Sequence, residues 1–161
     1  MSILVRHAMT ESPQTAKPDM TAADAAGLMQ QLDVGVVPIV DGETLIGLVT
    51  DRDIVTRVVA TRQDPDEMRL ADILTRSPVT VSPDTKLADA RNVMAEHRVR
   101  RLPVLKDDRL VGILSLGDIA LADASERAVG QTLEDISQSG STTDSGGGPD
   151  RGTPDRVRDA G

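Results

Sequence analysis

Aromatic residues are absent from this chain, which has no Phe, Tyr or Trp among its 161 residues. Proteins that bind single-stranded nucleic acid stack the bases on aromatic side chains, so this absence argues against that function. A core without aromatics must be filled by Val, Leu, Ile, Ala and Met, and it lacks the large buried area that each aromatic contributes. We therefore expect the apolar residues to share one interior rather than to form two independent domains of about sixty residues.

Cysteine is also absent, and the only histidines are His7 and His97. The lack of cysteine excludes disulfides, thiol chemistry and cysteine-based zinc sites. The two histidines do not align within the repeat described below, which argues against a metal centre. The amino-terminal MSILVRHAM is too short for the apolar region of a signal peptide, and no window approaches eighteen apolar residues. We expect a cytoplasmic protein that does not contact a membrane.

Basic surface and catalytic motifs are equally scarce. The net charge of −8 argues against binding of duplex nucleic acid, which needs a basic surface. There is no nucleophile paired with a histidine, no Walker-type glycine–lysine loop and no Gly-x-Gly-x-x-Gly fingerprint. We expect that the protein is not an enzyme and requires no cofactor.

What the chain does contain is an internal repeat. Residues 5–54 align without a gap to residues 70–119, at a constant offset of 65 positions. A repeat of this kind fixes the architecture and predicts a pseudo-symmetric pair of units with a cleft between them. Identical pairs include Ser12-Pro13 with Ser77-Pro78, Pro18-Asp19 with Pro83-Asp84, Pro38 with Pro103, Gly47 with Gly112, and Asp53-Ile54 with Asp118-Ile119.

Each repeat changes its apolar period in the same order. A short extended piece is followed by residues at helical spacing, then by two β-branched runs with a polar link, then by helical spacing again. The predicted order is strand, helix, strand, strand, helix, which gives a mixed α+β fold. The predicted strands are 14–17, 36–40 and 45–50 in the first repeat and 79–82, 101–105 and 110–115 in the second. Pro38 and Pro103 predict that their strands lie at a sheet edge, where the missing N–H is not needed.

The domain organisation follows from the repeat. We predict repeat 1 at residues 3–60, a polar linker at 61–68, repeat 2 at 69–123 and a helix at 124–137, interrupted by Gly130. From residue 138 to 161 the composition falls to Gly, Ser, Thr, Asp, Pro and Arg, with few apolar residues. Such a segment cannot bury enough apolar surface to offset its ordering entropy, so a disordered tail is predicted.

The order of elements and the stretches VVPIVDGETLIGLVTDRDIV and VRRLPVLKDDRLVGILSLGDIA resemble cystathionine-beta-synthase (CBS) domains in a tandem Bateman module. The resemblance covers about residues 3–123, and the stretches TDRDIV and HRVRRLPV look like those of small stand-alone bacterial CBS-pair proteins. It implies a pseudo-twofold module that binds an adenosyl ligand in its central cleft, with AMP, ADP, ATP, NAD and S-adenosylmethionine as candidates. It also implies a homodimer of two modules.

The most informative matched motif is Gly-h-h-[Thr/Ser]-x-x-Asp, where h is apolar. It places Thr50 with Asp53 and Ser115 with Asp118. In the family the carboxylate accepts hydrogen bonds from the two ribose hydroxyls, and a carboxylate can receive two such donors. A hydroxyl residue followed three positions later by Asp is also a helix-capping arrangement, and the two roles are compatible.

Arginines form a second constellation. The resemblance implies that basic residues before the second strand contact ligand phosphates, which matches Arg100 and Arg101, and guanidinium groups suit phosphate. The first repeat has Gly35 and Val36 there, so it offers no equivalent phosphate clamp. We expect Arg52, which aligns with Gly117, to compensate as a phosphate contact, and the two half-sites are therefore not expected to be equivalent. The alternative is that the arginines are a solvated charge run.

Main-chain groups around Thr15-Ala16 and Thr80-Val81 would meet the adenine in this family. The leading hypothesis is a non-catalytic sensor that binds an adenosyl ligand and changes its affinity for a regulated protein partner. The alternative is a scaffold with the same fold and empty clefts, which only dimerises and docks a partner.

Overall fold

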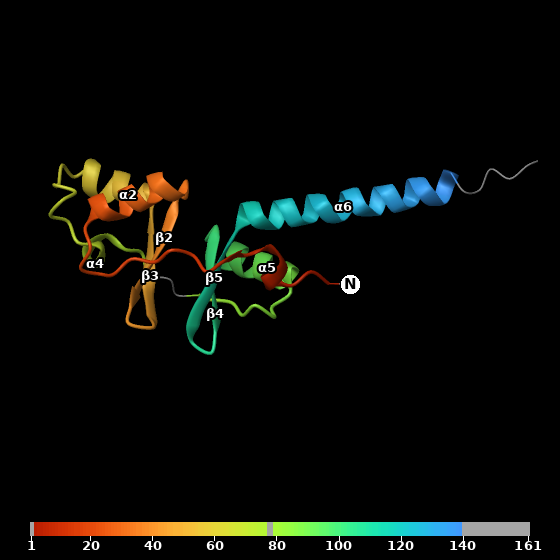
Figure 1. The fold of residues 1–161 in the computed structure, drawn as a ribbon, viewed down its shortest axis with the longest axis horizontal. Helices are drawn as coiled ribbons and strands as arrows, with labels where there is room; N and C mark the ends of the chain where they lie inside the picture. The colour runs from red at the N-terminus through yellow and green to blue at the C-terminus, as the bar shows by residue number, and fades with distance from the viewer. Residues whose placement is uncertain (1, 77–78, 140–161) are drawn as a thin grey trace, which may run out of the picture. The chain divides into compact units, whose positions relative to one another are not determined.

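The computed structural model describes residues 2–76 and 79–139 (Figure 1). The chain divides into two compact units, residues 1–124 and 125–161. The second unit is described only as far as residue 139, and it is helical over that range because α6 spans Leu116–Ser139. This helix starts earlier than the predicted 124–137 segment and passes through Gly130 without a break. The predicted disordered tail lies outside the described residues, apart from residues 138 and 139, which end α6.

The first unit is built from two similar series of elements, and the mixed α+β fold is confirmed. The first series is α1 (Val5–Ala8), β1 (Thr10–Glu11), α2 (Ala22–Leu32), β2 (Val36–Asp41), β3 (Thr44–Thr50), α3 (Asp51–Ile54) and a π-helical turn, η1 (Val55–Val59). The second is α4 (Leu70–Ile73), α5 (Leu87–His97), β4 (Arg101–Lys106), β5 (Arg109–Ser115) and α6. β2 and β3 form one antiparallel hairpin, and β4 and β5 form another, to which β1 adds as a third strand. Figure 1 shows each hairpin with its preceding helix, α2 or α5.

The predicted strand at the start of each repeat is reduced to a single bridge residue. In the first repeat the Ala16 N–H donates to the Pro38 carbonyl at 2.9 Å, and the Ala16 carbonyl accepts from the Val40 N–H at 2.9 Å. To extend this pairing, the next backbone hydrogen bond before Ala16 would need the N–H of Pro38. The next one after Ala16 would need the N–H of Pro18, and proline has no N–H. The ladder therefore stops after one bridge. The second repeat repeats this arrangement at Val81, Pro83, Pro103 and Leu105.

Pro38 and Pro103 themselves lie on edge strands, as predicted. Along its length β2 pairs only with β3, and β4 pairs only with β5. The other edge of each strand forms just the single bridge, and it is on this edge that the proline lacks an N–H.

The two hydrophobic cores do not follow the boundaries of the sequence repeats. The first core lies between α2 and the β2–β3 hairpin, yet it includes Leu70 and Ile73 from the second repeat, both fully buried. The second core lies between α5 and the β4–β5 hairpin, and it includes the fully buried Val5 from the first repeat. Each repeat therefore completes the core of the other with its own first segment.

Backbone hydrogen bonds hold the exchanged segments in place, and they obey the pseudo-symmetry. The Val5 N–H donates to the Thr85 carbonyl at 2.8 Å, and the equivalent Leu70 N–H donates to the Met20 carbonyl at 2.8 Å. Farther along, Thr10 pairs with Ile113 and the equivalent Thr75 forms a bridge to Leu48. The exchange thus carries residues 10 and 75 onto the hairpin of the opposite repeat.

Gly47 and Gly112 allow this close approach. A Cβ at Gly47 would lie 2.6 Å from the Thr75 carbonyl oxygen, and one at Gly112 would lie 2.9 Å from that of Thr10. Such distances are too short for any side chain, so glycine is required where the exchanged backbone crosses the strand.

Candidate functional site

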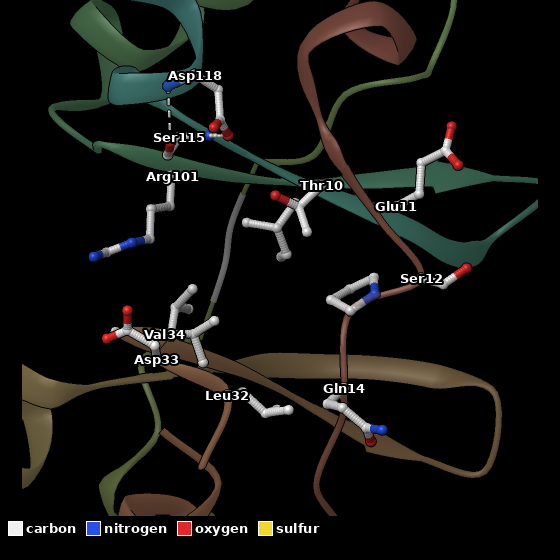
Figure 2. Close-up of a pocket in the computed structure, with 14 residues that line it drawn as sticks. Thr10, Glu11, Ser12, Gln14, Leu32, Asp33, Val34, Arg101, Ser115 and Asp118 are labelled. Atoms are coloured by element: carbon white, nitrogen blue, oxygen red, sulfur yellow. Dashed lines mark hydrogen bonds between the residues drawn. The ribbon is translucent and has the colours of Figure 1, made fainter. Parts of the chain in front are cut away.

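A pocket of about 540 Å³ lies between the repeats, and we call it the cross-repeat pocket (Figure 2). The first repeat contributes the segment after α1 and the end of α2, and the second contributes β4, β5 and the start of α6. Because the exchange places residues 10–12 against β5, the pocket exists only when both repeats are assembled. Its lining residues are Thr10, Glu11, Ser12, Pro13, Gln14, Leu32, Asp33, Val34, Gly35, Val36, Arg101, Ile113, Ser115 and Asp118.

Ser115 and Asp118 form a reciprocal cap at the start of α6, on the wall of this pocket. The Ser115 N–H donates to Asp118 Oδ2 at 2.8 Å, and the Asp118 N–H donates to Ser115 Oγ at 3.0 Å. Asp118 is half-buried, and among the described residues its carboxylate has no ion pair and no other hydrogen-bond donor. A carboxylate has room for about four donors, so Asp118 is both capped and available to a ligand.

Thr50 and Asp53 form the equivalent cap in the first repeat, but the carboxylate has more partners. The Thr50 N–H donates to Asp53 Oδ2 at 2.9 Å, and the Thr75 hydroxyl donates to Oδ1 at 3.2 Å. Arg57 Nη2 lies 3.8 Å from the same Oδ1. Asp53 is 7% exposed and is the one buried charged residue in the described part of the chain. The motif thus caps a helix in both repeats. Of the two carboxylates, Asp118 is the one that lines the cross-repeat pocket.

A second pocket, of about 720 Å³, adjoins the first, and we call it the arginine pocket. Arg101 and Ser115 line both pockets. The Leu116 N–H donates to the Arg100 carbonyl at 2.8 Å, which fixes the start of α6 beside the two arginines. The lining residues are Thr50, Asp51, Arg52, Arg100, Arg101, Ser115, Leu116, Gly117 and Ala120.

Arg101 reaches across the boundary between the repeats toward Gly35. A Cβ at Gly35 would lie 3.3 Å from Arg101 Nη2 and 3.2 Å from Asp51 Oδ2. Gly35 aligns with Arg100 of the second repeat, and its missing Cβ leaves room for the Arg101 side chain. Figure 2 shows the Arg101 side chain extending into the space between Ser115 and Asp33.

The two pockets carry opposite charge. Among the described residues, the cross-repeat pocket is lined by three acidic residues, Glu11, Asp33 and Asp118, and by one arginine, Arg101. The arginine pocket has the reverse balance, because Arg52 and Arg100 join Arg101 there and Asp51 is the only acid among its described lining residues. Carboxylates accept hydrogen bonds from hydroxyl and amino donors, and guanidinium groups pair with phosphate and carboxylate oxygens. Together the pockets suit a ligand with donors at one end and an anion at the other.

The residues predicted to meet an adenine through their main chains lie elsewhere. Ala16 and Val81 are buried, and their backbone N–H and carbonyl groups are used in the single bridges of the two first strands. Thr15 and Thr80 are exposed and line neither the cross-repeat pocket nor the arginine pocket.

The sequence analysis missed the other wall of the cross-repeat pocket, residues 10–14 and 32–36. Leu32, the last residue of α2, and Val34, two positions beyond it, are 41% and 40% exposed, so the cores leave them uncovered. The internal repeat was the one sequence feature related to this wall. The first segment of each repeat pairs with the hairpin of the other repeat, so the crossing occurs in both copies.

Two further properties bear on the class of protein. Within residues 2–76 and 79–139 there is no group of three or more His, Asp or Glu side chains placed to hold a metal ion. Over the same residues, no helix combines the length and the apolar character that a transmembrane span requires.

Comparison with known proteins identifies the family. The model of the CBS domain matches residues 5–60 and again residues 70–125. The CBS domain-containing protein YhcV of Bacillus subtilis is 38% identical over 133 residues, covering 83% of this chain and 94% of that protein.

Solved structures agree with this assignment. The crystal structure of Hypoxic Response Protein I, a protein of Mycobacterium tuberculosis that was solved with two coordinated zinc ions, is 34% identical with a TM-score of 0.66, covering 73% of this chain and 97% of that one. The hexameric CBS-CP12 protein from bloom-forming cyanobacteria is 31% identical with a TM-score of 0.69, covering 75% and 72% of the two chains. The chain belongs to the CBS-domain family, and its first unit is a tandem pair of CBS domains.

Proposed function

We propose that this protein is a non-catalytic sensor that binds an adenine nucleotide across the two adjoining pockets. The nucleoside occupies the cross-repeat pocket with its ribose at Asp118, and the phosphates extend into the arginine pocket. The observation that carries this proposal is that Arg101 and Ser115 line both pockets, so one elongated ligand can fill both.

The chemistry of each end supports this orientation. Oδ1 of Asp118 has no donor among the described residues, and a vicinal diol supplies two O–H donors to one carboxylate. At the other end Arg52, Arg100 and Arg101 provide rigid forks that match phosphate oxygens. The base would lie between residues 10–14 and the exposed apolar end of α2, which replaces the predicted contacts at Thr15-Ala16 and Thr80-Val81.

The arginine pocket also ranks the candidate ligands. Three guanidinium groups against one carboxylate favour the most highly charged phosphate chain, so affinity should fall in the order ATP, ADP, AMP. S-Adenosylmethionine carries a sulfonium cation in place of phosphates, and NAD has a second nucleoside that this pocket must also accommodate. Because these ligands are metabolites of the cytoplasm, the proposal also assigns the protein to that compartment.

The experiment is a thermal-unfolding series with AMP, ADP, ATP, NAD and S-adenosylmethionine. A ligand at one hundred times its dissociation constant should add about 2.7 kcal/mol to the free energy of unfolding. Asp118→Asn should lose most of the shift, since the amide replaces an acceptor by a donor while the residue keeps its shape. If none of the five ligands shifts the transition at millimolar concentration, the sensor function is wrong.

Assembly is the second part of the proposal. The helices that follow the two hairpins expose apolar side chains: Val55 and Val59 are 57% and 65% exposed, and Leu116 and Leu121 are 45% and 70% exposed. Exposed apolar side chains on the corresponding helices of the two repeats favour burial against a second copy of the chain. We propose a homodimer through these helices. Nucleotide binding would then be linked reciprocally to the affinity for a regulated protein partner.

Light scattering with Val59→Lys tests the dimer. In the proposed dimer a lysine at position 59 would be buried at the interface, so this variant should weaken dimerisation. Thr61→Lys, an exposed change on the neighbouring turn, should leave dimerisation unchanged. A stable dimer with no response to any nucleotide would favour the alternative function, a CBS-pair scaffold that docks a partner without a ligand.

A further inference from the structure

The two ribose-type carboxylates of this chain are not chemically equal. Both cap a helix in the same way, but among the described residues only Asp53 has additional partners, at Thr75 and Arg57. This inequality rests on the proposed nucleotide function and concerns the number of nucleotides that one chain binds.

Arg57 connects Asp53 to the exchanged segment of the other repeat. Its Nη1 donates to the Ile73 carbonyl at 2.7 Å and to the Leu74 carbonyl at 3.1 Å, at the end of α4. Its Nη2 faces Asp53 Oδ1 at 3.8 Å, and Thr75, the next residue of that segment, donates its hydroxyl to the same oxygen. The guanidinium thus links the backbone carbonyls of Ile73 and Leu74 to the carboxylate of Asp53.

The second repeat cannot form this connection. The residue 65 positions after Arg57 is Ala122, which has no donor. The equivalent of Thr75 is Thr10, which lines the cross-repeat pocket together with Asp118. Asp118 therefore faces a pocket, with an oxygen that no described residue occupies.

We infer that Arg57 and Thr75 withdraw Asp53 from ligand binding, so that each chain binds one nucleotide with high affinity, at Asp118. A diol approaching Asp53 must displace the Thr75 hydroxyl and compete with the Arg57 charge for Oδ1. At Asp118 it displaces nothing that the structure describes. Arg57 is a positioning residue: it acts on nucleotide binding through Asp53, not by touching the nucleotide.

Titration calorimetry with ATP on the full chain tests this inference. The wild type should bind one ATP per chain, and Asp118→Asn should weaken that binding by about tenfold or more, the scale of one lost charge-assisted hydrogen bond. Asp53→Asn should change the affinity by less than about threefold, since its carboxylate is already occupied. The double variant R57A/T75V should raise the stoichiometry from one to two, a change that loss of structure alone cannot produce.

Matched variants separate charge from packing. Arg57→Lys keeps a cation near Asp53 and should keep the stoichiometry at one. Ala122→Arg transfers the guanidinium to the second repeat and should weaken ATP binding at Asp118 by about tenfold, while Ala122→Leu, which adds bulk without charge, should weaken it less. Unfolding temperatures of all variants establish that they are folded.

The outcomes distinguish the two proposals. Two equivalent ATP molecules per wild-type chain, or equal losses from Asp53→Asn and Asp118→Asn, would overturn the inference and leave the sensor function standing. A stoichiometry of one in R57A/T75V would also overturn it. No ATP binding by the wild type and by every variant would overturn both proposals together.

Discussion

Single residues of this chain are constrained by backbone contacts that composition does not reveal. Gly47 and Gly27 are both glycines in regular elements, yet their surroundings differ completely. A Cβ at Gly47 would meet the Thr75 carbonyl oxygen and Leu74 Cδ1 within 2.8 Å, whereas one at Gly27 would meet nothing within 4 Å. The same residue type is therefore required at one position and replaceable at the other.

Gly47→Ala should lower the free energy of unfolding by about 1–3 kcal/mol, because the backbone of the exchanged segment must shift. Gly27→Ala, in the exposed part of α2, should raise it by about 0.5–1 kcal/mol through the lower entropy of the unfolded chain. Denaturant unfolding of both variants measures the contrast. Equal effects at the two positions would show that residues 74–75 do not approach β3 closely in solution.

Arginines of the second repeat provide the other test at this scale. Arg101 lines both pockets, while Arg109 lies at a hairpin turn and pairs with Glu43 at 3.1 Å, with both side chains largely exposed. Arg101→Ala should weaken ATP binding by about tenfold or more, since a phosphate loses a charge-assisted partner. Arg109→Ala should leave ATP binding unchanged. Competition titrations against a fluorescent ATP analogue would measure both, and equal losses would argue against a specific role for Arg101.

At the scale of elements, the decisive feature is the exchange of α1 and α4 between the repeats. Both are helices of four residues, too short to be stable by themselves. Their buried residues, Val5 on α1 and Leu70 and Ile73 on α4, are held by the core of the opposite repeat. The exchange also delivers residues 10–14 to the cross-repeat pocket, so the same contact that completes a core builds the candidate site.

Leu70→Ala should lower the free energy of unfolding by about 2–5 kcal/mol, the range for truncation of a buried leucine. Its local effect should appear in the first core, so backbone amides of α2, β2 and β3 should exchange with deuterium faster than those of α5. The control is Val129→Ala: the valine is 61% exposed, so its truncation should change the free energy of unfolding by less than about 0.5 kcal/mol. Faster exchange confined to α5 and the β4–β5 hairpin would contradict the exchanged arrangement.

At the scale of the whole molecule, neither repeat contains all the residues of its own core. A fragment of residues 1–66 lacks Leu70 and Ile73 from its core, and a fragment of residues 67–124 lacks Val5. Each fragment would leave apolar surface of its core exposed to water, and chains of this size have little stability to spare.

Each fragment alone should therefore give the circular dichroism spectrum of a largely unfolded chain, and mixing them at equal concentration should restore helical signal with a one-to-one stoichiometry. The restored complex should also recover ATP binding, because the cross-repeat pocket needs both halves. A folded, monomeric 1–66 fragment would contradict this prediction.

The amino-acid sequence determined the repeat, the order of helices and hairpins, and the capping motifs that end at Asp53 and Asp118, because these features are local and recur at a fixed offset. It placed Pro38 and Pro103 on edge strands, but it overestimated the first strand of each repeat, since the effect of Pro18 and Pro38 depends on which residues pair.

Only the tertiary structure decided which repeat supplies each buried residue and which carboxylate lines the cross-repeat pocket. Thr50–Asp53 and Ser115–Asp118 are nearly identical as motifs, and they differ through Arg57 and Thr75, which reach Asp53 only after the chain has folded. Contacts between residues far apart in the chain depend on packing geometry, and no local pattern encodes that geometry.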